Sequence, residues 1–220
     1  MANITELKEK ARLLNLQNLA SGGIDVSQEQ KANLEFLDRI LSRELELRKE
    51  RKIEKLKRAS GFPKGVFNFN SVPNIVSWQI EKLLKFEWIE DNQNLFIIGE
   101  CNTGKTSLMS YVGNKAIERE YKAAYFKIDE LLTENKNTML KLKDTDLIVI
   151  DDILYLPLPN EKLQQLYRKL IFLNESRSIA LITNRELSGW IECSEDKHTM
   201  QTMLDRLNGN AQTLRLNKSK

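Results

Sequence analysis

The sequence predicts an α/β fold in three layers, with a parallel β-sheet between helices, preceded by a small all-α N-terminal domain. From residue 94 onward, short apolar runs alternate with helical patterns, which is the order of strands and helices in a parallel sheet. Between the first run and its helix lies Gly99–Thr106, which satisfies the pattern G-x-x-x-x-G-K-[ST]. The first 64 residues contain helical patterns only.

Composition sets broad limits on the protein. Residues 1–64 contain 14 Lys and Arg against 10 Asp and Glu, and residues 65–220 contain 20 against 21, so the excess positive charge lies in the first third. Two cysteines are too few for a disulfide framework, no secretory signal is present, and no apolar run approaches the length of a membrane helix. We therefore expect a soluble, cytoplasmic protein without a membrane partner.

The N-terminal domain is predicted at residues 1–64. Asn3–Glu6 resembles a capping box and starts an amphipathic helix that ends at Gly22-Gly23. A second helix starts at Ser27–Gln30 with a wide apolar face and becomes mostly polar over Arg43–Arg58, which has eight basic and four acidic residues. Gly61–Gly65 breaks the pattern and marks the predicted boundary to a core at residues 65–220.

The core begins with a helix that has Pro73 near its first turn, Ser71 or Asn70 as its cap, and Trp88 near its end. Strands are then predicted at 95–98, 123–128, 146–151, 178–183 and 212–216, and helices at 107–121, 130–142, 161–174 and 200–207.

The segment Gly99–Thr106 is typical of a phosphate-binding loop. Its glycines let backbone N–H groups point inward, and the following helix adds partial positive charge. Lys105 would reach the outer phosphates of ATP, and the Thr106 hydroxyl would bind Mg²⁺. A chance glycine turn is the alternative, and the flanking strand and helix favour the phosphate-binding loop. The predicted nucleotide-binding residues are Gly99, Glu100, Cys101, Asn102, Thr103, Gly104, Lys105, Thr106 and Ser107.

Three further segments complete a predicted catalytic site. The apolar run before Asp151 and Asp152 is typical of a Walker B strand, so Asp151 would hold Mg²⁺ and Asp152 would orient the attacking water. An ordinary core strand ending in a solvated turn is the alternative. Asn184 closes the next strand, either as a sensor of the γ-phosphate or as a turn residue. Arg206 either reaches a neighbouring subunit's γ-phosphate or pairs at the surface with an acidic neighbour.

The order of these motifs resembles the IstB-like helper ATPases of insertion sequences, a branch of AAA+ proteins close to the DnaC-type helicase loaders. The resemblance covers nearly the whole chain, including Phe62-Pro63, the two Walker segments, Ile182–Asn184 and Leu204–Leu207. It implies an AAA+ core and a Mg²⁺-dependent ATPase that oligomerises on duplex DNA and delivers this DNA to a transposase. It also implies that Arg206 is an arginine finger supplied in trans.

Departures from the family pattern are also present. Glu100–Asn102 replaces the family's usual Pro-Pro-Gly and adds a negative charge, and Asp152 stands where many AAA+ proteins have Glu. After Asn217–Lys220 the family usually continues, so a second-sensor Arg is not assignable, and we expect the helical lid to be absent or vestigial.

The basic second helix is the predicted DNA contact. Its side chains would neutralise backbone phosphates in a sequence-independent, salt-sensitive way. A solvated helix with Glu-to-Lys pairs is the alternative. The predicted DNA-contacting residues are Arg48, Lys49, Arg51, Lys52, Lys55 and Arg58.

Three rival functions stay open at this point. A DnaC-like replicative helicase loader would dock its N-terminal segment on a helicase. A small-molecule kinase would need a lid with phosphate-binding arginines, which the sequence does not clearly offer. A nucleotide-binding scaffold would have little turnover because of Glu100 and Asp152. The oligomer number, the DNA geometry and the transposase are also left open.

Overall fold

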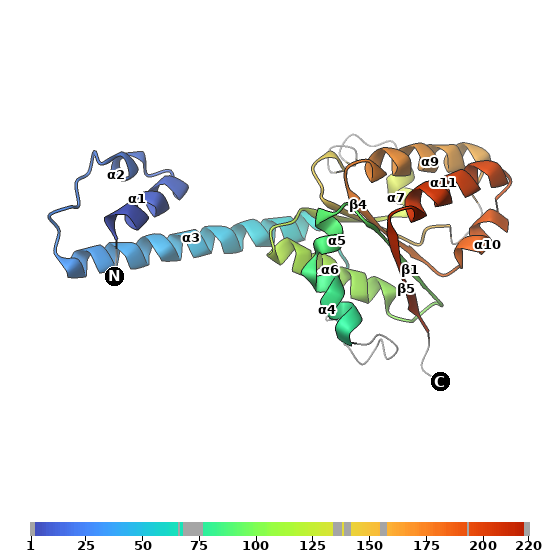
Figure 1. The fold of residues 1–220 in the computed structure, drawn as a ribbon, viewed down its shortest axis with the longest axis horizontal. Helices are drawn as coiled ribbons and strands as arrows, with labels where there is room; N and C mark the ends of the chain where they lie inside the picture. The colour runs from blue at the N-terminus through green and yellow to red at the C-terminus, as the bar shows by residue number, and fades with distance from the viewer. Residues whose placement is uncertain are drawn as a thin grey trace. The chain divides into compact units, whose positions relative to one another are not determined.

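The computed structural model describes residues 3–65, 67, 77–133, 138, 142–154, 158–192 and 194–217. Two compact units are formed by residues 1–55 and 56–220, and Figure 1 traces their elements. The division falls within helix α3, Lys31–Ser60, and the domain boundary at residues 64 and 65 stays a prediction. Within the described part of the chain, no helix has both the length and the apolar character to cross a membrane.

The N-terminal unit contains α1, Ile4–Leu13, α2, Gln17–Ser21, and most of α3. The Asn3 side chain caps α1 by accepting a hydrogen bond from the Thr5 N–H. The prediction of one continuous first helix was wrong, because Asn15 has a left-handed backbone with φ 61° and separates α2 from α1. The buried core of this unit consists of Leu7, Ala11, Leu14, Leu19, Ala20, Val26 and Leu41.

The second unit is built on a five-stranded parallel sheet, which confirms the predicted α/β class. Its strands are β1, Asn94–Gly99, β2, Ala123–Lys127, β3, Leu147–Asp151, β4, Ser178–Thr183, and β5, Ala211–Leu216. Their spatial order is β2-β3-β4-β1-β5, and every neighbouring pair is parallel. All five carboxyl ends therefore lie at one edge, where open α/β sheets bind ligands.

Helices cover both faces of this sheet. Figure 1 shows α4 and α6 on one face and α9 and α11 on the other. The helices are α4, Ser77–Lys85, α5, Glu87–Glu90, α6, Lys105–Glu118, α7, Ile128–Leu132, α9, Asn160–Asn174, α10, Leu187–Glu192, and α11, Lys197–Asn208. The larger core joins α7, α9 and α11 to apolar side chains of the sheet. Both faces are covered, which explains why the strands read as uninterrupted apolar runs.

Several helix boundaries differ from the prediction. The predicted helix from Pro73 to Trp88 breaks at Phe86, whose φ is 64°, and its start lies outside the described residues. The helix predicted at 130–142 begins at Ile128 as α7, and part of its predicted length is not described. Helix α10 was not predicted, and α11 begins three residues early because the Asp196 side chain caps it by accepting from the Thr199 N–H.

Candidate nucleotide site

The loop between β1 and α6 has the backbone of a phosphate cradle. Asn102 and Gly104 are left-handed, with φ of 64° and 84°. Glycine adopts this region freely, and asparagine does so more easily than most residues. The Thr103 hydroxyl donates to the Glu100 carbonyl at 2.9 Å and closes the loop. Helix α6 then begins at Lys105, so its first N–H groups face this loop.

Gly99 is required for a reason that the motif does not show. A β-carbon at Gly99 would lie 2.2 Å from the carbonyl oxygen of Leu216 on the neighbouring β5. No side chain fits at that distance, since the obstacle is backbone of the paired strand. The first glycine of the motif therefore keeps β1 and β5 together where the loop begins.

Lys105 folds back over this loop. Its Nζ donates to the carbonyl oxygens of Gly99 and Glu100 at 2.7 and 2.6 Å. Partial burial lowers the pKa of Lys105, while the electrostatic influence of nearby Asp151 and Asp152 opposes this shift. A phosphate would offer the ammonium a full opposite charge in place of two carbonyl dipoles.

Asp151, at the end of β3, is the best-connected carboxylate of the site. It is 3% exposed. Its Oδ2 accepts from Thr106 Oγ1 at 2.7 Å and from the Tyr125 hydroxyl at 2.7 Å, and its Oδ1 accepts from the Asp152 N–H at 2.8 Å. The structure thus joins the two predicted metal-binding residues, which lie 45 positions apart in the sequence.

Tyr125 on β2 is the residue of this site that sequence reasoning missed. Burial, followed by its hydrogen bond to Asp151, raises the pKa of Tyr125 well above its ordinary value. The phenol therefore stays protonated at neutral pH and acts as a donor. The sequence does not show that β2 pairs with β3, which is the pairing that brings this side chain to Asp151.

Thr106 and Asp151 fit a bound Mg²⁺ ion. Magnesium prefers oxygen ligands in an octahedron at 2.0–2.1 Å, so adjacent ligands lie about 2.9 Å apart. The 2.7 Å between Thr106 Oγ1 and Asp151 Oδ2 is close to this spacing. In the described ranges no group of three or more His, Cys, Asp or Glu side chains could hold a metal.

Asp152 and Asn184 follow neighbouring strands and are both exposed. Asp152 has φ 57°, so the chain turns sharply directly after β3. The Ile153 N–H donates to the Ile182 carbonyl at 3.1 Å and fastens this turn to β4. Asn184 Nδ2 lies 3.8 Å from Cys101 Sγ in the phosphate loop, a weak hydrogen bond that places the amide beside this loop. The sheet order explains this proximity, because β4 lies between β3 and β1.

Arg206 lies on α11, and its side chain is exposed. Its guanidinium carbon is 5.9 Å from the ring centroid of Tyr167 on α9, a cation–π arrangement. Asp205, the acidic residue next to Arg206 in the sequence, accepts a hydrogen bond from Gln201 at 2.7 Å.

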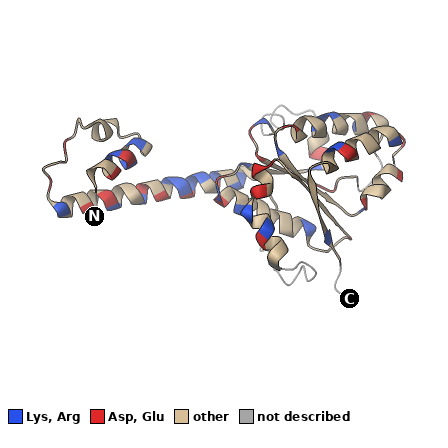
Figure 2. Ribbon diagram, in the orientation of Figure 1, with Lys and Arg blue, Asp and Glu red and all other residues tan. Residues whose placement is uncertain are grey.

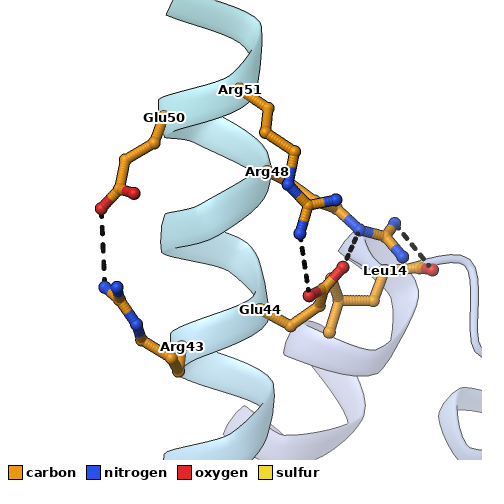
Figure 3. A network of polar contacts seen from close by, with 6 residues as sticks. All are labelled: Leu14, Arg43, Glu44, Arg48, Glu50 and Arg51. Carbon is orange, nitrogen blue, oxygen red and sulfur yellow. Dashed lines mark hydrogen bonds and ion pairs between the residues drawn. The ribbon is translucent and has the colours of Figure 1, made fainter.

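The basic half of α3 is partly engaged in contacts within the chain (Figure 3). Arg48 Nε pairs with Glu44 at 2.8 Å, and the Arg48 Nη1 donates to the Leu14 carbonyl at 3.2 Å. Arg51 also reaches Glu44, at 3.5 Å. The Arg48 contact with Leu14 joins α3 to the end of α1, so Arg48 has a structural role that the sequence did not reveal.

Basic residues prevail along this half of α3 (Figure 2). At about 100° per residue, five predicted DNA-contacting residues fall within about 120° of one another. They are Arg48, Arg51, Lys52, Lys55 and Arg58. Glu46, Glu50 and Glu54 fall on the opposite flank, and Lys49 lies between the flanks. Glu44 lies on the basic flank, where it pairs with Arg48 and Arg51. Such a flank is suited to a row of phosphates.

Comparison with known proteins identifies the family. The model of the IstB-like ATP-binding proteins matches residues 9–219. The chain belongs to this family. It is 28% identical over 219 residues to an insertion sequence IS21-like ATP-binding protein of Bacteroides fragilis, covering 92% of this chain and 83% of the relative. It is 27% identical to the insertion sequence IS232 ATP-binding protein of Bacillus thuringiensis, covering 79% and 75%.

Solved structures of similar fold include DnaI, with a TM-score of 0.52, 12% identity, and coverage of 67% of this chain and 88% of DnaI. The DnaC helicase loader has a TM-score of 0.51 and 13% identity, with 63% and 86% covered. Domain III of the Thermotoga maritima replication initiation protein DnaA has a TM-score of 0.54 and 19% identity, with 71% and 70% covered. The predicted resemblance is confirmed, and this IstB-like protein is an ATP-binding protein with an AAA+-type fold.

Proposed function

We propose that this IstB-like protein is a Mg²⁺-dependent ATPase that assembles on duplex DNA and presents it to a transposase. The observation that carries the proposal is the joining of the phosphate loop to Asp151 through the 2.7 Å bond from Thr106. Lys105 would bind the outer phosphates, Asp152 would orient the attacking water, and Asn184 would report the γ-phosphate. A bound Mg²⁺ would neutralise charge that develops on the transferred phosphoryl group.

The nucleotide site is tested with Lys105→Ala. Calorimetry should show at least a tenfold loss of affinity for Mg·ATP, on the order expected for removal of a charged phosphate contact. Lys115→Ala is the matched control, because Lys115 lies on the same helix and pairs with Glu118 at 2.7 Å. Equal affinity of Lys105→Ala and wild type would remove the assignment of the phosphate loop.

A finger supplied in trans is tested by mixing two inactive variants. Arg206→Ala retains an intact phosphate loop, and Lys105→Ala retains an intact Arg206. If the finger acts between subunits, the mixture should hydrolyse ATP on duplex DNA although each variant alone does not. Arg168→Ala, an exposed change on α9, should stay active by itself. Normal hydrolysis by Arg206→Ala alone would refute the role.

Duplex binding through α3 is tested by salt dependence. Lys52→Ala and Lys55→Ala should each lower the slope of log affinity against log salt by about one, equally on unrelated sequences. Lys31→Ala, at the other end of α3 and within 3.7 Å of Glu35, should leave the slope unchanged. The insertion-sequence names of its relatives favour transposition over helicase loading. If the protein preferred single-stranded DNA and co-purified with a helicase, helicase loading would be favoured over transposition.

A further inference from the structure

Tyr125 gives the site a donor that lies outside all the motifs discussed above. The side chain is 6% exposed and Asp151 is 3% exposed, so both groups are largely shielded from water. The Tyr125 hydroxyl donates to the same Asp151 oxygen that accepts from Thr106. Asp151 therefore has two hydroxyl donors on Oδ2, and only one of them belongs to the phosphate loop.

The Tyr125 ring is itself held by packing. Its centroid lies 5.8 Å from that of Phe62, with the rings tilted by 50°, a favourable aromatic geometry. Phe62 is 9% exposed and lies against Gly113 of α6, where a β-carbon would be 2.1 Å from the Phe62 ring. The absent side chain at Gly113 provides the space for Phe62, and Phe62 in turn limits the movement of Tyr125.

We propose that Tyr125 is a positioning residue that orients Asp151 for a nucleotide-bound metal ion, and that Phe62 acts through it. This inference rests on the proposed ATPase function. A metal bound to the Thr106 oxygen would help to set the direction of the Thr106 O–H bond, which here points at Asp151. The Tyr125 hydroxyl would still donate to Oδ2 from outside the phosphate loop, and the Asp152 N–H would still donate to Oδ1. Asp151 would therefore keep its orientation when the Thr106 hydroxyl binds a metal.

The test compares Tyr125→Phe with Tyr121→Phe. Each change removes one hydroxyl that donates to a carboxylate, and the control hydroxyl bonds Glu90 at 2.6 Å instead of Asp151. Calorimetry with a non-hydrolysable ATP analogue measures affinity in EDTA and at stepwise Mg²⁺ concentrations. Tyr125→Phe should match wild type in EDTA within about twofold and require about tenfold more Mg²⁺ for half-maximal tightening. Tyr121→Phe should follow wild type throughout.

The outcomes separate this inference from the proposed function. A wild-type protein that shows no Mg²⁺-dependent uptake of the analogue refutes the ATPase itself. Wild-type uptake together with an unchanged or lower Mg²⁺ requirement in Tyr125→Phe refutes the positioning role alone. Loss of binding by Tyr125→Phe in EDTA also refutes it, because the hydroxyl would then support the whole pocket.

Phe62→Leu tests the second part of the proposal. It should raise the Mg²⁺ requirement in the same direction as Tyr125→Phe, because the phenol ring loses its aromatic support. If Phe62 acts through Tyr125, the double variant should need no more Mg²⁺ than Tyr125→Phe alone. Multiplied effects of the two changes would show that Phe62 acts independently and would refute this part.

Discussion

Asn94→Ala offers a quantitative test of how β1 is fixed in the core. Asn94 is 1% exposed. Its Nδ2 donates to the Leu207 carbonyl at 2.9 Å and to the Asn174 side chain, and its Oδ1 accepts from the Ile179 N–H at 3.1 Å. One amide thus joins the first residue of β1 to β4, α9 and α11.

The variant would leave two buried backbone groups, the Ile179 N–H and the Leu207 carbonyl, without this partner. Each such group costs about 1–3 kcal/mol, so we expect a loss of about 2–6 kcal/mol in the free energy of unfolding. Asn174 is only partly buried and adds little. A domain of this kind is stabilised by about 5–15 kcal/mol in total, so the loss should be large enough to measure.

Urea unfolding followed by tryptophan fluorescence is a suitable assay. All three tryptophans lie in the unit 56–220, so the signal reports that unit. Asn208→Ala is the control, because Asn208 is exposed at the end of α11 and its loss should change stability by no more than about 0.5 kcal/mol. An Asn94→Ala midpoint equal to that of the control, at unchanged slope, would refute the argument.

Three other results are expected. Gly99→Ala should lower the melting temperature and weaken ATP binding, because the new β-carbon meets the β5 backbone at 2.2 Å, whereas Gly65→Ala, with nothing within 4 Å, should change neither. Arg48→Lys keeps the charge but loses the forked contacts of the guanidinium, so circular dichroism should show earlier melting of the N-terminal helices with an unchanged salt slope for DNA. The hydrogen bond to Glu90, with burial, raises the pKa of Tyr121 to about 12. Folding therefore favours the neutral phenol. Wild type should be more stable than Tyr121→Phe below pH 10, and this difference in the free energy of unfolding should disappear as the pH rises toward 12.

The strands of the core could be predicted from the sequence because helices cover both faces of a parallel sheet. A strand covered on both faces must be apolar throughout, and Leu147–Asp151 is buried at every position. The phosphate loop could be predicted because its residue types are set by local backbone geometry, as at Asn102 and Gly104. The strands and the phosphate loop each leave a pattern within a short stretch of sequence, so predicting them needed no knowledge of the tertiary structure.

The parts that sequence reasoning missed depend on contacts between distant segments. Arg48 reaches a carbonyl 34 residues earlier in the chain, and this contact leaves no periodic signal in the sequence. Gly113 likewise has no turn to explain it, and only the Phe62 ring beside it gives its reason.

Strand order decides which of the predicted residues meet. In sequence, β2 stands between β1 and β3, yet in the sheet β1 lies between β4 and β5, and among the described strands β2 pairs with β3 alone. This places Asn184 next to the phosphate loop and Tyr125 next to Asp151, two contacts whose members lie 83 and 26 positions apart. The motifs specify the residue types of the loop and of Asp151, whereas the sheet order selects the side chains that contact them. A supporting residue is therefore best sought on the strand that pairs with β3, and Tyr125 is the polar side chain there that reaches the carboxylate.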